Sequence, residues 1–86
     1  MTTPGRTVTL LTRAGCGACD GAWRILVPLC AEYGGPCEAI AVDGAAAQDP
    51  DLRAEYGDRL PVVLLDGREH SYWDVDEPRL RRDLSA

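Results

Sequence analysis

The spacing of hydrophobic positions divides the first part of the chain into a strand and a helix. Residues 7–12 are short, apolar and rich in β-branched side chains, which predicts a strand buried on at least one face. In residues 16–33 hydrophobic side chains recur every three or four positions, which predicts a helix with one face in the core. Pro28 lies inside this helix and removes one backbone hydrogen bond. We therefore expect a kink near Arg24 or Ile25, or two separate helices.

A second strand is predicted at residues 37–43, after glycines end the helix. Because a helix of this length connects the two strands, they should lie parallel in a right-handed β-α-β unit. After a loop of small residues at 44–48, Asp49 and Pro50 form the capping pattern of a short helix that ends near Gly57.

The last third of the chain has the pattern of a hairpin followed by a helix. Residues 60–65 form a continuous apolar run, as in a central strand buried on both faces. Asp66 and Gly67 are a strong signal for a hairpin turn, so residues 69–73 should form an antiparallel partner for that run. A last helix is predicted from Asp76 onward, with arginines on its exposed side. Its apolar contacts should be Val75, Leu80 and Leu84.

In chain order, these elements predict an α/β domain of the form β-α-β-α-β-β-α. Its four strands would form one mixed sheet flanked by three helices. With 86 residues, the chain has room for one compact domain. We expect this domain to span residues 7–86, after a flexible lead-in at residues 1–6, and we expect a monomer.

Charge and composition argue against several classes of partner. The net charge is −5 at pH 7, the chain contains no lysine and its arginines are scattered, so we expect no nucleic-acid binding. The first residues lack the apolar region of a secretion signal, and no stretch approaches about 18 apolar residues, so we expect neither export nor a membrane span. The expected location is cytoplasmic, where ordinary thiols stay reduced. The four cysteines therefore need another explanation.

Two of the cysteines have the spacing of a redox pair. The motif Cys-Gly-Ala-Cys at residues 16–19 follows a predicted strand and opens a predicted helix. Free N–H groups and the dipole at a helix N-terminus favour the thiolate, which is the form that attacks disulfides. Cys19 lies one turn further on the same face, so Cys16 should attack and Cys19 should resolve. Arg13 would add positive charge beside Cys16, whereas Asp20 opposes an anion there, and the sequence does not decide their net effect.

The residues alone leave other interpretations of the cysteines open. Cys16 and Cys19 would otherwise be two buried structural thiols, or half of a zinc site completed by Cys30 and Cys37. Because Cys30 lies on the core-facing stripe of the predicted helix, Cys30 and Cys37 most simply act as small buried hydrophobic residues. A regulatory disulfide between these two is the alternative.

Single residues outside the motif give weaker signals. Pro61 stands at the head of a central strand, where it cannot donate to the sheet, and a cis turn would explain its position. His70 is expected to be an exposed strand residue without a role. Trp23, Tyr72 and Trp73 are expected to be buried or half-buried, although aromatic side chains beside a thiol site, Tyr72 above all, also form docking surfaces.

The chain resembles the glutaredoxin-like branch of the thioredoxin superfamily over residues 7–85. The resemblance rests on the first strand, the Cys-x-x-Cys motif, the helix after it, the Leu60-Pro61-Val62 segment and the Asp-Gly turn that leads to the last helix. It implies a thioredoxin-like (glutaredoxin-like) fold with a cis peptide bond before Pro61.

The resemblance also implies roles for individual residues. Cys16 would be the nucleophile and Cys19 the resolving thiol. Leu60 would pair through its backbone with the peptide part of a bound thiol substrate. Arg13 falls where glutaredoxins commonly carry a basic residue, and Asp74 aligns with an acidic residue that holds the amine of glutathione.

Two departures from the family pattern bear on the electron donor. Ser71 and Tyr72 replace the Gly-Gly pair that lets glutathione approach the backbone. Gly17 and Ala18 replace the Pro and Tyr that usually stand between the cysteines. Glutathione is therefore one candidate reductant, and a flavoprotein reductase or another redoxin is the other.

The sequence thus predicts a thiol–disulfide oxidoreductase with a dithiol mechanism. It would act on protein disulfides or on mixed disulfides with a small thiol such as glutathione. We expect no bound cofactor and no metal. The alternative is a non-enzymatic thioredoxin-fold module that binds a metal or an iron–sulfur cluster through its cysteines, as some glutaredoxin relatives do. The residues expected to bind substrate are Arg13, Leu60, Pro61, Tyr72 and Asp74.

Overall fold

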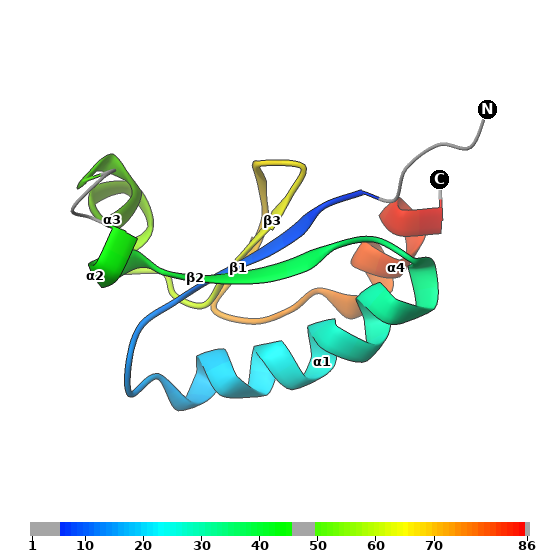
Figure 1. Cartoon of the computed structure of the whole chain (residues 1–86), viewed down its shortest axis with the longest axis horizontal. Helices are drawn as coiled ribbons and strands as arrows, with labels where there is room; N and C mark the ends of the chain where they lie inside the picture. The colour runs from blue at the N-terminus through cyan, green and yellow to red at the C-terminus, as the bar shows by residue number, and fades with distance from the viewer. Residues whose placement is uncertain (1–5, 46–49, 86) are drawn as a thin grey trace.

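The fold is a mixed β-sheet with helices on both faces (Figure 1). It is described by a computed structural model that covers residues 6–45 and 50–85. The elements in chain order are β1 (Val8–Thr12), α1 (Gly17–Tyr33), β2 (Cys37–Ala41), α2 (Val42–Ala45), α3 (Pro50–Tyr56), β3 (Val62–Leu65), β4 (Arg68–Tyr72) and α4 (Glu77–Ser85).

The four strands of the sheet lie in the order β2-β1-β3-β4. β1 is parallel to β2 and antiparallel to β3, and β4 is antiparallel to β3, so the predicted β-α-β unit and hairpin are confirmed. Thr12 pairs with Ala41, and Val62 pairs with Tyr72 and lies opposite Leu11. The last residues of β1, β2 and β4 and the first residue of β3 therefore lie at the same end of the strands. We call this the site end of the sheet.

Side chains from the two faces of the sheet form two separate hydrophobic clusters. Alternate residues of β1 and β3 point to opposite faces, as the pleat of a strand requires. Figure 1 shows α1 and α4 on one face, with α2 and α3 beyond the other. The larger cluster joins α1 and α4 to the sheet and includes Val8, Leu10, Ala22, Leu26, Leu29, Val63, Leu65, Val75 and Leu80. The smaller cluster consists of Leu11, Val42, Val62 and Leu64, with Ile40, Tyr56 and Leu60 packed against it.

Helix α1 runs as one helix through Pro28, which rules out the alternative of two separate helices, while the kink near Arg24 or Ile25 stays a prediction. Pro28 is exposed, while Leu26 and Leu29 on either side of it are buried in the larger cluster. The tertiary packing of this apolar face outweighs the loss of one backbone hydrogen bond. Gly34 ends the helix with a φ of 72°, and its N–H donates to the carbonyl oxygen of Cys30.

Several predicted boundaries move in the structure. β2 ends at Ala41 rather than at residue 43, because Val42 turns into the smaller cluster and starts the short helix α2. The described residues therefore contain four helices rather than three. β3 begins at Val62 and β4 covers Arg68–Tyr72, so Leu60, Pro61 and Trp73 lie outside the strands. The predicted lead-in at residues 1–6 lies outside the described residues except for Arg6. The predicted capping residue Asp49 also lies outside them.

The hairpin turn between β3 and β4 is formed by Asp66 and Gly67, as predicted. Both residues have positive φ, 53° for Asp66 and 83° for Gly67, as a tight turn matched to the strand twist requires.

Within residues 6–45 and 50–85, no helix is both long enough and apolar enough to cross a membrane.

Candidate active site

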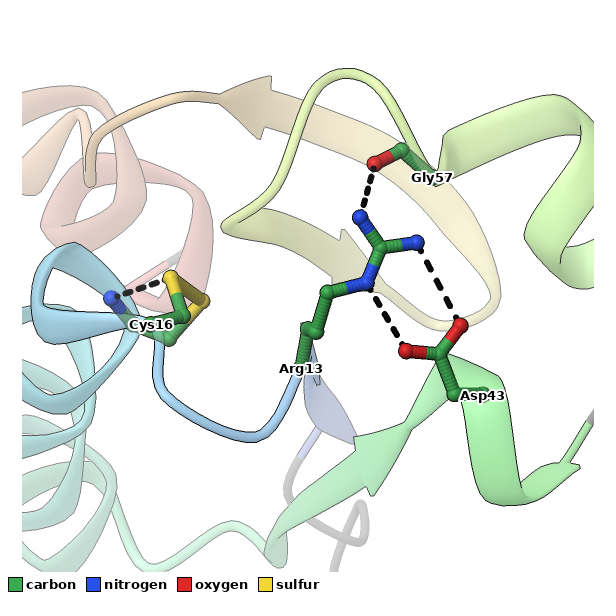
Figure 2. The surroundings of a disulfide bond; sticks show 5 residues. Arg13, Cys16, Asp43 and Gly57 are labelled. Atoms are coloured by element: carbon green, nitrogen blue, oxygen red, sulfur yellow. Dashed lines mark hydrogen bonds and ion pairs between the residues drawn. A yellow bond between two sulfur atoms is a disulfide. The ribbon is translucent and has the colours of Figure 1, made fainter.

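The Cys16–Cys19 pair lies at the beginning of α1, next to the site end of the sheet (Figure 2). Cys16 is the N-cap residue of the helix, with φ −89° and ψ 100°. Its Sγ accepts a hydrogen bond of 3.1 Å from the backbone N–H of Cys19. The two sulfur atoms are joined in a disulfide, with 5.2 Å between the Cα atoms. The sequence motif is therefore placed where helix N–H groups stabilise negative charge on Cys16.

The two cysteines differ in exposure. Cys16 is half-buried, whereas only 2% of Cys19 is exposed to solvent. Cys16 is therefore the cysteine of the pair that is open to an incoming disulfide, while Cys19 is covered by the fold. This difference agrees with the expected order of attack and resolution, because thiolate access controls which sulfur reacts first.

A short turn connects β1 to α1 and keeps Arg13 beside Cys16 in the backbone. The N–H of Cys16 donates to the carbonyl oxygen of Arg13 over 3.2 Å. Gly15, between them, has a φ of 77°, a conformation that side chains other than glycine rarely adopt. The turn therefore fixes the backbone of Arg13 close to the disulfide.

The side chain of Arg13 points away from the disulfide, which corrects the expectation that it adds charge beside Cys16 (Figure 2). Its Nε and Nη2 donate to the two carboxylate oxygens of Asp43 over 2.9 and 3.3 Å. Its Nη1 donates to the carbonyl oxygen of Gly57 over 3.4 Å. A carboxylate in α2 attracts the guanidinium more specifically than a disulfide, which carries no charge. Asp43 was not among the predicted site residues, because the two partners are far apart in sequence.

The segment before β3 also reaches the site end of the sheet. The Leu60–Pro61 peptide bond is cis, and Pro61 is buried while Leu60 is half-buried. The N–H of Trp73 is shared between the carbonyl oxygens of Arg59 and Pro61, at 3.1 and 2.7 Å. Among the described residues, no backbone group pairs with the N–H or C=O of Leu60. Leu60 therefore presents backbone groups that an extended chain can pair with.

Tyr72 and Trp73 form an exposed aromatic pair at the end of β4. Tyr72 is 48% exposed and Trp73 is 63% exposed, so the prediction that both are buried or half-buried is wrong. Their rings are 5.1 Å apart in an edge-to-face arrangement, and the guanidinium of Arg59 lies 5.9 Å from the Tyr72 ring. Trp73 has a φ of 66°, which is rare for a bulky residue. Backbone outliers of this kind cluster at functional sites. Trp23, by contrast, packs half-buried against the larger cluster.

Asp74 lies just beyond this aromatic pair, where its carboxylate caps the backbone. Its Oδ1 accepts a hydrogen bond of 2.8 Å from the N–H of Val75. Asp74 also lines an open surface pocket of about 510 Å³, together with Tyr72, Asp76 and Arg79. Asp74 and Tyr72 therefore line the same pocket, and one carboxylate oxygen of Asp74 is already bonded to the N–H of Val75.

The side chain of His70 in β4 is buried, which corrects the prediction of an exposed histidine. Its side chain is 6% exposed, and its Nε2 lies 2.7 Å from Oδ2 of Asp83 in α4. The hydrogen bond from His70 lowers the pKa of Asp83. The pair links β4 to α4 and belongs to the framework of the fold.

Cys30, in the last turn of α1, and Cys37, the first residue of β2, form a second pair. Both are free thiols; Cys30 is buried and Cys37 is half-buried. Burial, together with the adjacent Cys37 side chain, raises the pKa of Cys30 to about 12. The two cysteine pairs are separated by the length of the helix, so the four sulfurs do not form one zinc site. Within residues 6–45 and 50–85, no group of three or more His, Cys, Asp or Glu side chains is arranged to hold a metal ion.

Sequence comparison identifies the family. The Glutaredoxin-like domain (DUF836) matches residues 7–85, which is almost the whole chain. The protein belongs to this glutaredoxin-like family. Two curated relatives are the uncharacterized protein Rv0508 of Mycobacterium tuberculosis and the uncharacterized protein Mb0520 of Mycobacterium bovis. Each is 60% identical over 79 residues, which cover 91% of this chain and 81% of the relative.

Comparison with solved structures confirms the thioredoxin-like fold. The solution structure of protein Ne2328 from Nitrosomonas europaea has a TM-score of 0.80 and 23% identity, and the match covers 98% of this chain and 96% of that one. Oxidised thioredoxin O1 from Arabidopsis thaliana has a TM-score of 0.64 and 18% identity, with 94% and 76% covered. Identities this low support the fold and leave the activity to be argued from the site.

Proposed function

We propose that this protein is a thiol–disulfide oxidoreductase that works by a dithiol mechanism. One observation carries the proposal: an accessible Cys16 caps the N-terminus of α1, and a buried Cys19 lies within disulfide distance of it. The helix N-terminus stabilises the Cys16 thiolate, and the N–H of Cys19 is already directed at its sulfur.

In the first step, the thiolate of Cys16 attacks one sulfur of a substrate disulfide. A bond forms between Cys16 and that sulfur, the substrate S–S bond breaks, and the other sulfur leaves as a thiolate that takes a proton from water. The product is a mixed disulfide between the protein and one half of the substrate.

In the second step, the thiol of Cys19 loses its proton and attacks the sulfur of Cys16. The mixed disulfide breaks, the second half of the substrate leaves as a thiolate, and the Cys16–Cys19 disulfide forms. The substrate has gained two electrons and two protons, and the protein has lost them. A two-electron donor then restores both thiols.

The site end of the sheet would bind the substrate beside Cys16. The unpaired backbone groups of Leu60, next to the cis bond at Pro61, would pair with the peptide part of a substrate. The exposed ring of Tyr72 would contact a neighbouring side chain. Asp74 and Arg13 would contribute charge at the two sides of this surface. Their internal partners, Val75 and Asp43, limit how freely they do so.

The electron donor would be glutathione or a flavoprotein reductase. If glutathione serves, two molecules reduce the Cys16–Cys19 disulfide and leave as glutathione disulfide. The side chains of Ser71 and Tyr72 occupy the positions where glutaredoxins have two glycines, which favours the reductase. We propose a cytoplasmic location and a monomeric state for the working protein, acting on protein disulfides or small mixed disulfides.

Replacement of each cysteine of the pair tests the proposal. Cys16→Ser should lower the rate of disulfide reduction by at least about a hundredfold, because the serine hydroxyl is not ionised at neutral pH. Cys19→Ser should accumulate the mixed disulfide, which mass spectrometry detects as an adduct on Cys16. Cys37→Ser is the matched control and should keep the wild-type rate. A Cys16→Ser protein with comparable turnover would contradict the mechanism, and a metal that co-purifies with the two cysteines would favour a binding module.

A further inference from the structure

Arg13 is the positive side chain closest to Cys16 in the chain, and the fold directs it elsewhere. Its carbonyl oxygen accepts a hydrogen bond from the N–H of Cys16, so the backbones of the two residues are in contact. Its guanidinium nevertheless lies with Asp43 and Gly57, as Figure 2 shows. A charge that could stand beside an incoming anion is thus held by an internal partner.

The contact between Arg13 and Asp43 has the geometry of a specific pair. Two parallel N–H···O bonds join the guanidinium to the carboxylate, and a third bond joins it to the backbone of the segment between α3 and β3. Arg53 of α3 approaches the same carboxylate to 3.9 Å. The side chains of Arg13 and Asp43 are 43% and 48% exposed, so water and competing anions reach them. The pair is therefore well defined but not strong.

The sequence alone leaves the net charge beside Cys16 open, because Arg13 and Asp20 oppose each other there. The structure directs the Arg13 side chain to Asp43 and so removes it from this balance. Asp43, which Arg53 also approaches, offsets part of the charge of Arg13, while Asp20 in the first turn of α1 remains exposed. Asp74, at the end of β4, adds a second exposed carboxylate. An anionic disulfide approaching Cys16 meets little attraction, whereas a neutral one meets no penalty.

We propose that Asp43 is a positioning residue that determines substrate specificity by holding Arg13 away from the approach to Cys16. The site then favours neutral disulfides, including those of polypeptides, over small disulfides that carry carboxylates. Without Asp43, the guanidinium is free to bind a carboxylate next to Cys16. This inference rests on the proposed function, because it names the class of substrate for the same site.

The most direct test alkylates Cys16 in the reduced protein with two reagents that differ in charge. Iodoacetate is an anion and iodoacetamide is neutral, and both react with the same thiolate. Their rate ratio at Cys16, measured by mass mapping, therefore cancels any change in the pKa of Cys16. Asp43→Asn should raise the iodoacetate to iodoacetamide ratio about two- to five-fold at low salt, the range expected for an exposed ion pair. The increase should largely vanish near 1 M salt.

Asp66→Asn is the matched control, because it makes the same chemical change in another Asp–Arg pair. Asp66 bonds Arg6 over 2.7 Å, and Leu65 beside it pairs with Val8, at the opposite end of the sheet from the site. Both variants change the net charge of the protein by the same amount. The control should leave the rate ratio at Cys16 within the error of the wild-type value.

The double variant Arg13→Gln/Asp43→Asn decides whether Asp43 acts through Arg13. Our proposal predicts that the gain of the Asp43→Asn variant disappears in the double variant. A gain that persists without Arg13 would mean that Asp43 simply repels the anionic reagent, and the proposal would be overturned. An unchanged ratio in the Asp43→Asn variant would overturn it as well.

The same variants carry the test to disulfide substrates. Relative to bis(2-hydroxyethyl) disulfide, which is neutral, kcat/KM for glutathione disulfide should rise in the Asp43→Asn variant and stay unchanged in the Asp66→Asn variant. If the wild-type protein reduces neither of these disulfides nor a protein disulfide, the proposed function fails, yet the alkylation ratio still decides the role of Asp43. If it reduces both and Asp43→Asn changes neither ratio, only the inference about Asp43 fails.

Discussion

Two pairs of cysteines lie near opposite ends of α1, and the fold places them in opposite environments: Cys16 and Cys19 at its start, and Cys30 in its last turn beside Cys37 of β2. At the N-terminal end, Cys16 is accessible and its sulfur accepts a hydrogen bond from the helix backbone. At the C-terminal end, Cys30 is 3% exposed and packs in the larger hydrophobic cluster beside Cys37. The N-terminal end of a helix favours a thiolate, whereas burial among apolar side chains favours the protonated thiol. Position in the fold, rather than residue type, thus distinguishes the pair for which we propose redox chemistry from the other pair.

The largest expected difference between the two pairs is in thiol reactivity. At pH 8, Cys30 should be alkylated at least about a thousand-fold more slowly than Cys16, because its pKa is raised from 9.0 to about 12 while the helix N-terminus favours the Cys16 thiolate. Mass-mapped labelling of the folded, reduced protein with iodoacetamide measures both rates. In urea the two rates should converge. Equal rates in the folded protein would break the comparison between the two pairs.

A smaller difference is expected when each thiol is replaced by a hydroxyl. Cys30→Ser should lower the free energy of unfolding by about 1–3 kcal/mol, because a hydroxyl is costly to bury in an apolar cluster. Cys16→Ser should change the stability of the reduced protein by less than about 0.5 kcal/mol. Urea titrations of the reduced proteins measure both values. The rate of disulfide reduction should fall in Cys16→Ser and not in Cys30→Ser. A loss of stability in Cys16→Ser as large as that in Cys30→Ser would contradict the contrast between the two pairs.

The smallest expected effect is a loss of stability of about 1 kcal/mol between pH 9 and 10. The unfolded thiol of Cys30 loses its proton near 9.0, whereas the folded one keeps it up to about 12. In this window the unfolded state binds fewer protons, so the free energy of unfolding falls as pH rises. The pKa of Tyr56 is also raised by burial and acts in the same direction. The effect of Cys30 is therefore measured as the difference between wild type and Cys30→Ala in the slope of the free energy of unfolding against pH. Identical slopes in the two proteins would contradict the prediction.

Local patterns in the sequence were sufficient to predict the framework of the site. The apolar run before Asp66-Gly67 predicts a central strand, and β3 is central in the sheet. The Cys-x-x-Cys spacing after a strand predicts a cysteine at the start of a helix, and Cys16 is the N-cap of α1. Both predictions depend on backbone geometry and on neighbours in the chain, which a short window of sequence contains.

Contacts between distant residues could not be predicted in this way. The side chain of Arg13 bonds Asp43, and the buried side chain of His70 bonds Asp83. The fold brings these residues together, and no spacing in the sequence relates them. Tyr72 and Trp73 are exposed because the chain leaves the sheet at the end of β4, which is an edge strand. Such side-chain directions depend on tertiary packing, and they decide the charge and the shape of the site.

The most direct test of the central claim is a redox titration of the protein in glutathione buffers. Trp23 fluorescence reports the state of the site, since Trp23 lies in α1 close after Cys19, and a thiol count confirms the number of electrons. We predict one reversible two-electron transition, between about −270 and −120 mV, that is unchanged in the Cys30→Ser/Cys37→Ser variant. The absence of a transition in the wild type, or its loss in that variant, would contradict the claim that Cys16 and Cys19 are the working pair.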